Sequence, residues 1–300
     1  ERGAQGAPFD NLQQRIKDFT SSKMAVNNSQ DPSKTDLKHL IDLFNKGQLE
    51  EVLFMARELL IKFSNSALLY NILGAANAGL GNFNVAISDY KKAITIDPNY
   101  PDAHNNMADS LQKMGDLDAA IASYKNAIEI KKDFAEAYNN LGNAYMEKGY
   151  WDISKAAFKK ALEIRPKYTT AHTSMGVVLY SKGELKHAIE SYHNAINVSP
   201  DELTAWGNVF YALQACKAQV NSVEHLLSQF GNGLQSPQAK LSLSILRYKL
   251  NLGGRASKKS QQEVIKTLSK MDTSFVKNPK LNTINTSLKP IRFKEVVALV

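Results

Sequence analysis

Residues 135–168 read AEAYNNLGNAYMEKGYWDISKAAFKKALEIRPKY, and this stretch decides the fold because its pattern recurs every 34 residues. Copies of the same length adjoin it without a gap, over residues 67–100, 101–134 and 169–202. A weaker copy covers residues 33–66, and residues 203–216 match the first helix of a sixth copy. Such strict spacing is hard to obtain by chance and is typical of proteins in which each unit stacks on its neighbours.

Fixed places within each copy predict a pair of helices. Small residues stand at the eighth place (Gly74, Ala108, Gly142, Gly176) and at the twenty-seventh (Ala93, Ala127, Ala161, Ala195), where they let two helices approach closely. Aromatic residues three places before the second set are expected to fill the gap between repeats: Tyr90, Tyr124, Phe158 and Tyr192.

Glycine and proline mark the ends of these helices. Glycine occupies the fifteenth place, where the first helix must end and turn: Gly81, Gly115, Gly149 and Gly183. Pro98, Pro166 and Pro200 close the second helix. The first copy keeps the turn glycine as Gly47 but has Leu40 at the eighth place, as expected of an N-terminal cap.

These residues resemble the tetratricopeptide repeat (TPR) family, and the resemblance covers residues 33–216. It implies an all-α fold, a right-handed α-α superhelix called a TPR solenoid, which binds other polypeptides and is not itself an enzyme. A helical cap is expected at its C-terminal end.

The rest of the chain is divided by composition. Residues 1–32 form an N-terminal tail that is partly helical or disordered, and residues 33–216 form the solenoid, with about five repeats and the first helix of a sixth. Residues 217–275 are expected to form the helical cap, and residues 276–300 a linker and an apolar strand that leads to a further domain. This end is similar to bacterial TPR-containing sulfotransferases, which implies a transferase domain beyond residue 300.

Asparagine recurs on the first helix of several units, with Ser174 at the matching place of one, and this helix is expected to line the concave side of the solenoid. The set is Asn71, Asn105, Asn106, Asn139, Asn140, Asn143, Ser174 and Asn208. A carboxamide both donates and accepts hydrogen bonds. Units about 10 Å apart would present one asparagine to about every third residue of an extended peptide, which advances about 3.3 Å per residue.

This set resembles the asparagine array of O-linked N-acetylglucosamine transferases, which implies sequence-tolerant capture of a polypeptide by its main chain. The alternative is that these asparagines only cap or link helices. Four acidic residues on the same helices favour a neutral or basic ligand: Asp102, Asp109, Glu136 and Glu147.

The distribution of charged residues argues against binding of nucleic acid by the repeats. Between residues 247 and 295 there are twelve Lys or Arg against three Asp or Glu, so this segment accounts for the whole formal net charge of +8. The repeats are therefore nearly neutral, and nucleic acid is an unlikely partner there. The basic segment is interpreted as a solvated cap, with nucleic acid or an acidic membrane as the less favoured ligand.

No residue pattern predicts catalysis or a cofactor. The six histidines have no metal-binding spacing, and His104 and His172, at the fourth place, are interpreted as structural. The single cysteine, Cys216, excludes an intramolecular disulfide and fits a cytoplasmic location. No apolar run is long enough to span a membrane. The expected partner is a protein or extended peptide, and a homo-oligomer is possible.

Overall fold

The computed structural model describes residues 31–215, 230, 235, 239–240 and 242–243. Within these residues there are eleven helices and no strand, which confirms the predicted all-α class. The chain divides into two units, Glu1–Tyr150 and Trp151–Val300.

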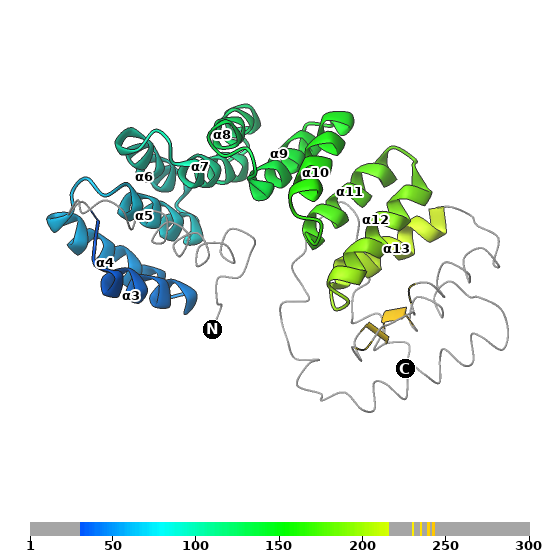
Figure 1. Cartoon of the computed structure of the whole chain (residues 1–300), viewed down its shortest axis with the longest axis horizontal. Coiled ribbons are helices and arrows are strands. Elements are labelled where there is room, and N and C mark those ends of the chain that lie inside the picture. The colour runs from blue at the N-terminus through cyan, green and yellow to red at the C-terminus, as the bar shows by residue number, and fades with distance from the viewer. Residues whose placement is uncertain (1–30, 216–229, 231–234, 236–238, 241, 244–300) are drawn as a thin grey trace. The chain divides into compact units, whose positions relative to one another are not determined.

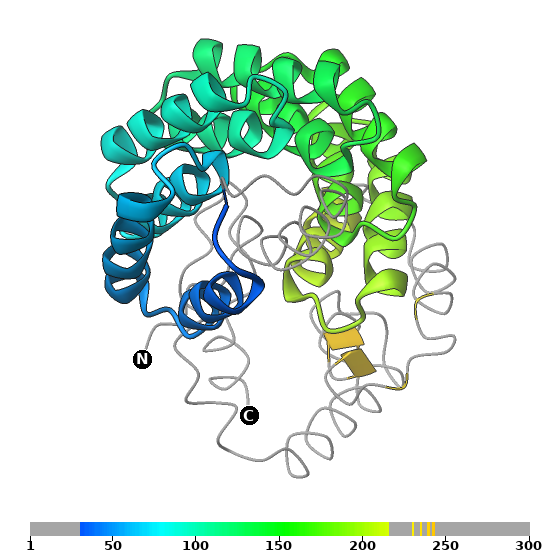
Figure 2. The ribbon, with the colours of Figure 1, turned by 60° about the vertical axis from the view of Figure 1, so that its left-hand side comes forward.

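The first unit contains seven helices in consecutive contact (Figure 1). They are α3 (Lys34–Asn45), α4 (Leu49–Lys62), α5 (Ala67–Gly79), α6 (Phe83–Ile96), α7 (Pro101–Lys113), α8 (Leu117–Ile130) and α9 (Ala135–Glu147). The second unit contains α10 (Trp151–Ile164), α11 (Thr169–Ser181), α12 (Leu185–Val198) and α13 (Leu203–Ala215). Figure 2 shows the helices of each unit from a second direction, again side by side as hairpins.

The predicted register is confirmed. The first helix of each full copy begins at the first residue of that copy, as α5, α7, α9 and α11 do. Local signals explain these starts: the Ser66 hydroxyl accepts a hydrogen bond from the amide of Leu69 at the start of α5, and Pro101 is the first residue of α7. The turn glycines adopt positive φ angles, for example 82° at Gly81 and 73° at Gly47.

In the α5–α6 and α11–α12 pairs, a glycine on the first helix packs against an aromatic ring on the second. A Cβ atom added to Gly74 would lie 2.5 Å from Cε1 of Tyr90, and one added to Gly176 would lie 2.3 Å from Cε1 of Tyr192. The rings therefore lie directly on the backbone of the first helix. The aromatic rings, which were expected to fill the gap between repeats, thus lie against the first helix of their own pair in both units.

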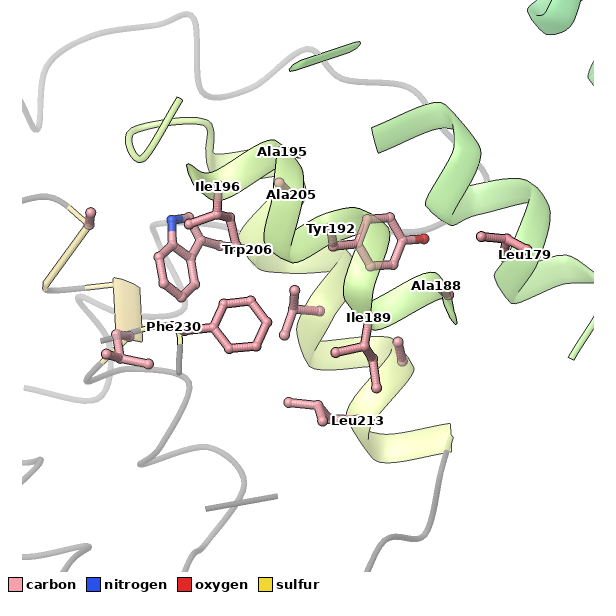
Figure 3. Packing of buried hydrophobic residues seen from close by; sticks show 14 residues of the cluster. Leu179, Ala188, Ile189, Tyr192, Ala195, Ile196, Ala205, Trp206, Leu213 and Phe230 are labelled. Carbon is pink, nitrogen blue, oxygen red and sulfur yellow. The ribbon is translucent and has the colours of Figure 1, made fainter. Parts of the chain in front are cut away.

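The core of the second unit lies between α12 and α13 (Figure 3). Tyr192 and Ile196 come from α12, and Trp206 and Leu213 from α13. Phe230 completes this cluster: its ring centroid lies 5.9 Å from that of Trp206. Ala239 and Leu243 are buried in the same cluster, so residues beyond α13 do cover its apolar face.

The remaining predictions lie outside the described residues. They concern the tail up to residue 30, the helices of the 217–275 cap apart from the few residues given above, the environment of Cys216, and the strand at residues 296–300.

Candidate functional site: polar seams between the first helices

The first helices of successive pairs contact each other directly, without a second helix between them. In the first unit α5 contacts α7, and α7 contacts α9; in the second unit α11 contacts α13. The predicted asparagines lie on these helices, so the contacts between them determine what each carboxamide does.

Two of these contacts are asparagine pairs in the same register. Nδ2 of Asn106 donates to Oδ1 of Asn71 at 3.1 Å, and Nδ2 of Asn140 donates to Oδ1 of Asn105 at 3.3 Å. Each pair joins the sixth place of one repeat to the fifth place of the repeat before it. These asparagines therefore link neighbouring first helices, in agreement with the alternative interpretation of the pattern.

A larger polar network surrounds the second pair, between α7 and α9. Nδ2 of Asn140 also donates to Oδ1 of Asp109 at 3.0 Å. The hydroxyl of Tyr124, from α8, donates to the same carboxylate and lies 2.9 Å from Oε1 of Gln112. Nε2 of Gln112 in turn donates to Glu147 on α9. We call this group the α7–α9 seam: Asn105, Asp109, Gln112, Tyr124, Asn140 and Glu147.

Burial divides the predicted asparagines of the first unit into two groups. Asn71, Asn105, Asn106 and Asn139 are buried, whereas Asn140 and Asn143 are half-buried. Asn140 has its orientation fixed by Asn105 and Asp109, and its Oδ1 accepts a hydrogen bond from Nδ2 of Asn139 at 3.3 Å. The side-chain amide of Asn143 has no hydrogen-bond partner within residues 31–215.

The two predicted site residues of the second unit lie on helices that contact each other. Ser174 on α11 is half-buried and Asn208 on α13 is buried. Neither side chain hydrogen-bonds to another described side chain, so the asparagine pairing of the first unit is not repeated between them.

Two first helices of the first unit, α7 and α9, are acidic, whereas α5 has no charged residue. Helices α5, α7 and α9 carry four carboxylates and a single lysine, Lys113. Lys148, which follows α9, is paired with Asp118 at 2.5 Å, and the hydrogen bond to this carboxylate raises the pKa of Lys148. Burial, with the nearby charge of Asp109, raises the pKa of Tyr124 well above its usual value, so its hydroxyl stays protonated and able to donate.

The histidines at the fourth place have a structural hydrogen bond. Nε2 of His104 lies 3.3 Å from the carbonyl oxygen of Pro98, and Nε2 of His172 lies 2.9 Å from that of Pro166. Trp206, at the same place, donates from Nε1 to the carbonyl of Pro200 at 2.9 Å. The imidazole thus hydrogen-bonds to the same proline carbonyl that the indole of Trp206 binds in another repeat. Among the described residues, no group of three or more His, Cys, Asp or Glu side chains could hold a metal ion.

Sequence reasoning missed the parts played by Gln112 and Tyr124. The sequence pattern indicates only a charge at Asp109 and only a packing role for Tyr124. A signal was present, because Asp109 and Gln112 are three residues apart and so lie on one face of α7.

Within the described part of the chain, none of the helices combines the length and the apolar character that crossing a membrane requires.

Comparisons with known proteins agree with this arrangement. Models of the TPR repeat match residues 74–115 and 108–149, and a model of the tetratricopeptide repeat matches residues 135–168. No curated protein matches the chain in sequence.

Two of the similar solved structures are described as TPR proteins. The C-terminal part of a TPR repeat-containing protein from Cytophaga hutchinsonii is 15% identical, with 80% of this chain and 98% of that chain covered and a TM-score of 0.56. A thermophilic TPR protein of Thermus thermophilus is 19% identical, with 60% and 98% covered and a TM-score of 0.52. A chain of the APC/C hetero-tetramer Cut9–Hcn1 is 16% identical, with 89% and 51% covered and a TM-score of 0.56.

These likenesses show the fold, and none of them supports the expected association with a sulfotransferase. The matched repeat models, the helix register and the packing of successive pairs lead to one conclusion: this chain contains tetratricopeptide repeats, and its described part has the fold of TPR solenoids.

Proposed function

We propose that the chain is a polypeptide-binding scaffold and that the surface formed by α7 and α9 holds an extended polypeptide by its main chain. The observation that carries this proposal is Asn143, a half-buried carboxamide with no partner among the described residues. It lies three residues after Asn140, so both amides are on one face of α9.

The two amides offer complementary hydrogen bonds. Both hydrogens of Asn140 Nδ2 are used by Asn105 and Asp109, so what it offers a ligand is the remaining acceptor capacity of Oδ1. Asn143 offers both a donor and an acceptor. Together they suit the alternating N–H and C=O groups of a peptide main chain, which every sequence has in common.

The buried asparagines support this surface from below. Asn71 with Asn106, and Asn105 with Asn140, fix the spacing of neighbouring first helices, and Asn139 fixes the side chain of Asn140. A surface whose groups are already held in place loses less freedom when a ligand binds. Of the eight residues predicted from sequence, four therefore act as supports in this proposal, and Asn140 and Asn143 contact the ligand.

In the second unit the half-buried Ser174 is proposed to contact the ligand, with the buried Asn208 beneath it on the neighbouring first helix; neither side chain hydrogen-bonds to another described side chain. The acidic character of α7 and α9 favours a neutral or basic polypeptide over an acidic one. Each amide contact is expected to contribute about 1 kcal/mol, so affinity depends on several contacts and is modest.

The test is a peptide-array screen followed by titration of the peptides that bind, with Asn143→Ala and Asn140→Ala. Loss of about 1 kcal/mol corresponds to a roughly fivefold weaker affinity. Asn126→Ala is the matched control, because Asn126 is exposed on the second helix α8. Equal affinity of Asn143→Ala and the control would refute the proposed surface.

Salt separates this function from its alternatives. Amide contacts to a main chain change little with salt, whereas binding of nucleic acid or an acidic membrane by the basic 247–295 segment would weaken steeply. A role as the non-catalytic arm of a larger transferase stays an untested prediction; it is compatible with the same surface, which would then present substrate.

A further inference from the structure

Helix α4 has two large apolar side chains on its solvent side. Phe54 is 69% exposed and Ile61 is 77% exposed. They are seven residues apart, which is two turns, so they lie on one face of the helix, about 10 Å apart along its axis. We call Phe54 and Ile61 the α4 patch.

Among the described repeats, no other second helix has large apolar side chains at these two places. The residues at the place of Phe54 are Ser88, Ala122, Ala156 and Glu190, and those at the place of Ile61 are Thr95, Glu129, Glu163 and Asn197. All eight are exposed, so both places face outward in every repeat. Stacking of repeats therefore does not explain why α4 is apolar at both.

The chain enters the described part beside one end of this patch. The Ser66 hydroxyl donates to the carboxylate of Asp31 at 2.6 Å. Ser66 is the N-cap of α5 and follows Ile61 by only five residues. Residues 1–30 therefore continue from a point next to the C-terminal end of α4.

The sequence of that preceding segment suits an apolar helix face. Phe9, Leu12, Ile16 and Phe19 are spaced three or four residues apart, which predicts one apolar stripe of a helix. Pro8 precedes them, as is common at a helix start. Eleven residues join Phe19 to Asp31, which is about 36 Å when extended and enough to place the stripe along α4.

We propose that residues 9–19 of this chain dock on the α4 patch and cover it as an N-terminal cap of the solenoid. Charges agree with this occupant: Arg57 and Glu58 lie exposed between Phe54 and Ile61, and the segment offers Asp18, Arg15 and Lys17 as partners of opposite sign. A tether of this length keeps the segment at a local concentration of about millimolar, so it competes effectively with any second copy. This proposal does not depend on peptide binding by α7 and α9.

The test measures tryptic cleavage after Arg15 and Lys17 in the full chain under native conditions, followed by mass spectrometry. A docked segment is cleaved only when it opens, so its cleavage rate follows the open population. Phe54→Ser with Ile61→Thr, the residues found in α6 at these places, should speed cleavage about tenfold or more. Ile16→Ser with Phe19→Ser should have the same effect, and all four changes together should add nothing further.

Val85→Ser is the matched control, since Val85 is 48% exposed on α6, outside the patch; it should leave the rate unchanged. The segment variant leaves the described repeats intact, so it tests the proposal even if the α4 variant folds poorly. Equal cleavage rates in the unchanged chain and both double variants would overturn the proposal. Protection that disappears on dilution would also overturn it, because it would assign the patch to a second copy.

Discussion

Nδ2 of Asn106 lies 3.1 Å from Oδ1 of Asn71, thirty-five residues earlier, and both side chains are buried between α5 and α7. Removal of one partner leaves the other amide buried with an unmet hydrogen bond, which costs about 1–3 kcal/mol. We expect Asn106→Ala to lower the free energy of unfolding by that amount in urea titrations. In a double-mutant cycle with Asn71→Ala the two changes should couple by at least about 0.5 kcal/mol, and strictly additive effects would contradict the pairing.

The two tyrosines at the twenty-fourth place are expected to respond in opposite ways to loss of the hydroxyl. Tyr124 donates to Asp109, whereas the Tyr192 hydroxyl is buried with no hydrogen-bond partner in the described part of the chain and points to the side on which Leu179 lies (Figure 3). Val177 and Tyr180 stand where Asp109 and Gln112 stand in the other repeat.

Tyr124→Phe should therefore cost about 1.5–3 kcal/mol, because it removes a hydrogen bond to a charged group. Tyr192→Phe should be neutral or stabilising, because it removes a buried polar group that has no partner. Chemical unfolding of both variants against the unchanged chain measures the difference. A larger loss for Tyr192→Phe than for Tyr124→Phe would contradict it.

The fold was predictable because packing between helices depends on a few places per repeat. A glycine or alanine at the eighth place and an aromatic ring at the twenty-fourth must meet within a helix pair, so residues such as Gly74 and Tyr90 set the register. The turn glycine then fixes where the first helix ends. These constraints act within one helix pair and recur in successive repeats, so the same residue types appear at the same places several times along the sequence.

The site was less predictable, because it depends on contacts between repeats. Asn105 and Asn106 are adjacent in sequence, yet Asn105 pairs with the following repeat and Asn106 with the preceding one. Only the crossing of neighbouring helices decides that division. The division of the chain after Tyr150 is likewise unmarked, since the copy that contains it keeps nearly every expected residue.

Gly176→Ala should destabilise the α11–α12 pair although alanine favours helices. The added methyl group would lie 2.3 Å from Cε1 of Tyr192, and such overpacking costs about 1–3 kcal/mol, which outweighs a gain of about 0.5–1 kcal/mol from helix propensity. Ala108 is accepted opposite Tyr124, so repeats differ in this spacing. The double variant Gly176→Ala with Tyr192→Leu should lose less stability in thermal unfolding than the two single variants lose in sum. Additive losses would mean that the strain of Gly176→Ala does not arise from contact with Tyr192.

Gly81→Ala isolates the cost of backbone conformation. Its φ is 82°, and a Cβ atom there would meet nothing within 4 Å, so steric crowding with neighbours plays no part. We expect a loss of about 1–2 kcal/mol in urea unfolding and a smaller loss for Gly81→Asn, since asparagine tolerates this conformation better. Equal losses for the two variants would indicate that the side chain, not the backbone, sets the cost.

His104 should make the first unit less stable as the pH falls below about 6.5. Burial lowers the pKa of His104 from its usual 6.5, an effect opposed by the hydrogen bond to the Pro98 carbonyl. With the proton on Nε2, the buried Nδ1 has no hydrogen-bond partner among the described residues, so a second proton would create a donor with nothing to accept it. The unfolded chain therefore binds this proton at a higher pH than the folded chain, and stability rises with pH through that window.

A swap with the residue used at the same place elsewhere tests this contribution. Tyr70 and Tyr138 occupy the fourth place in two other repeats, so His104→Tyr should be tolerated. As the pH falls from about 7 to about 5, the unchanged chain should lose stability relative to His104→Tyr. Urea unfolding of both proteins at each pH measures this difference. NMR titration of the imidazole gives an independent check: a midpoint at or above about 6.5 in the folded chain would mean that the ring is solvated or charge-paired, and that burial does not hold it neutral.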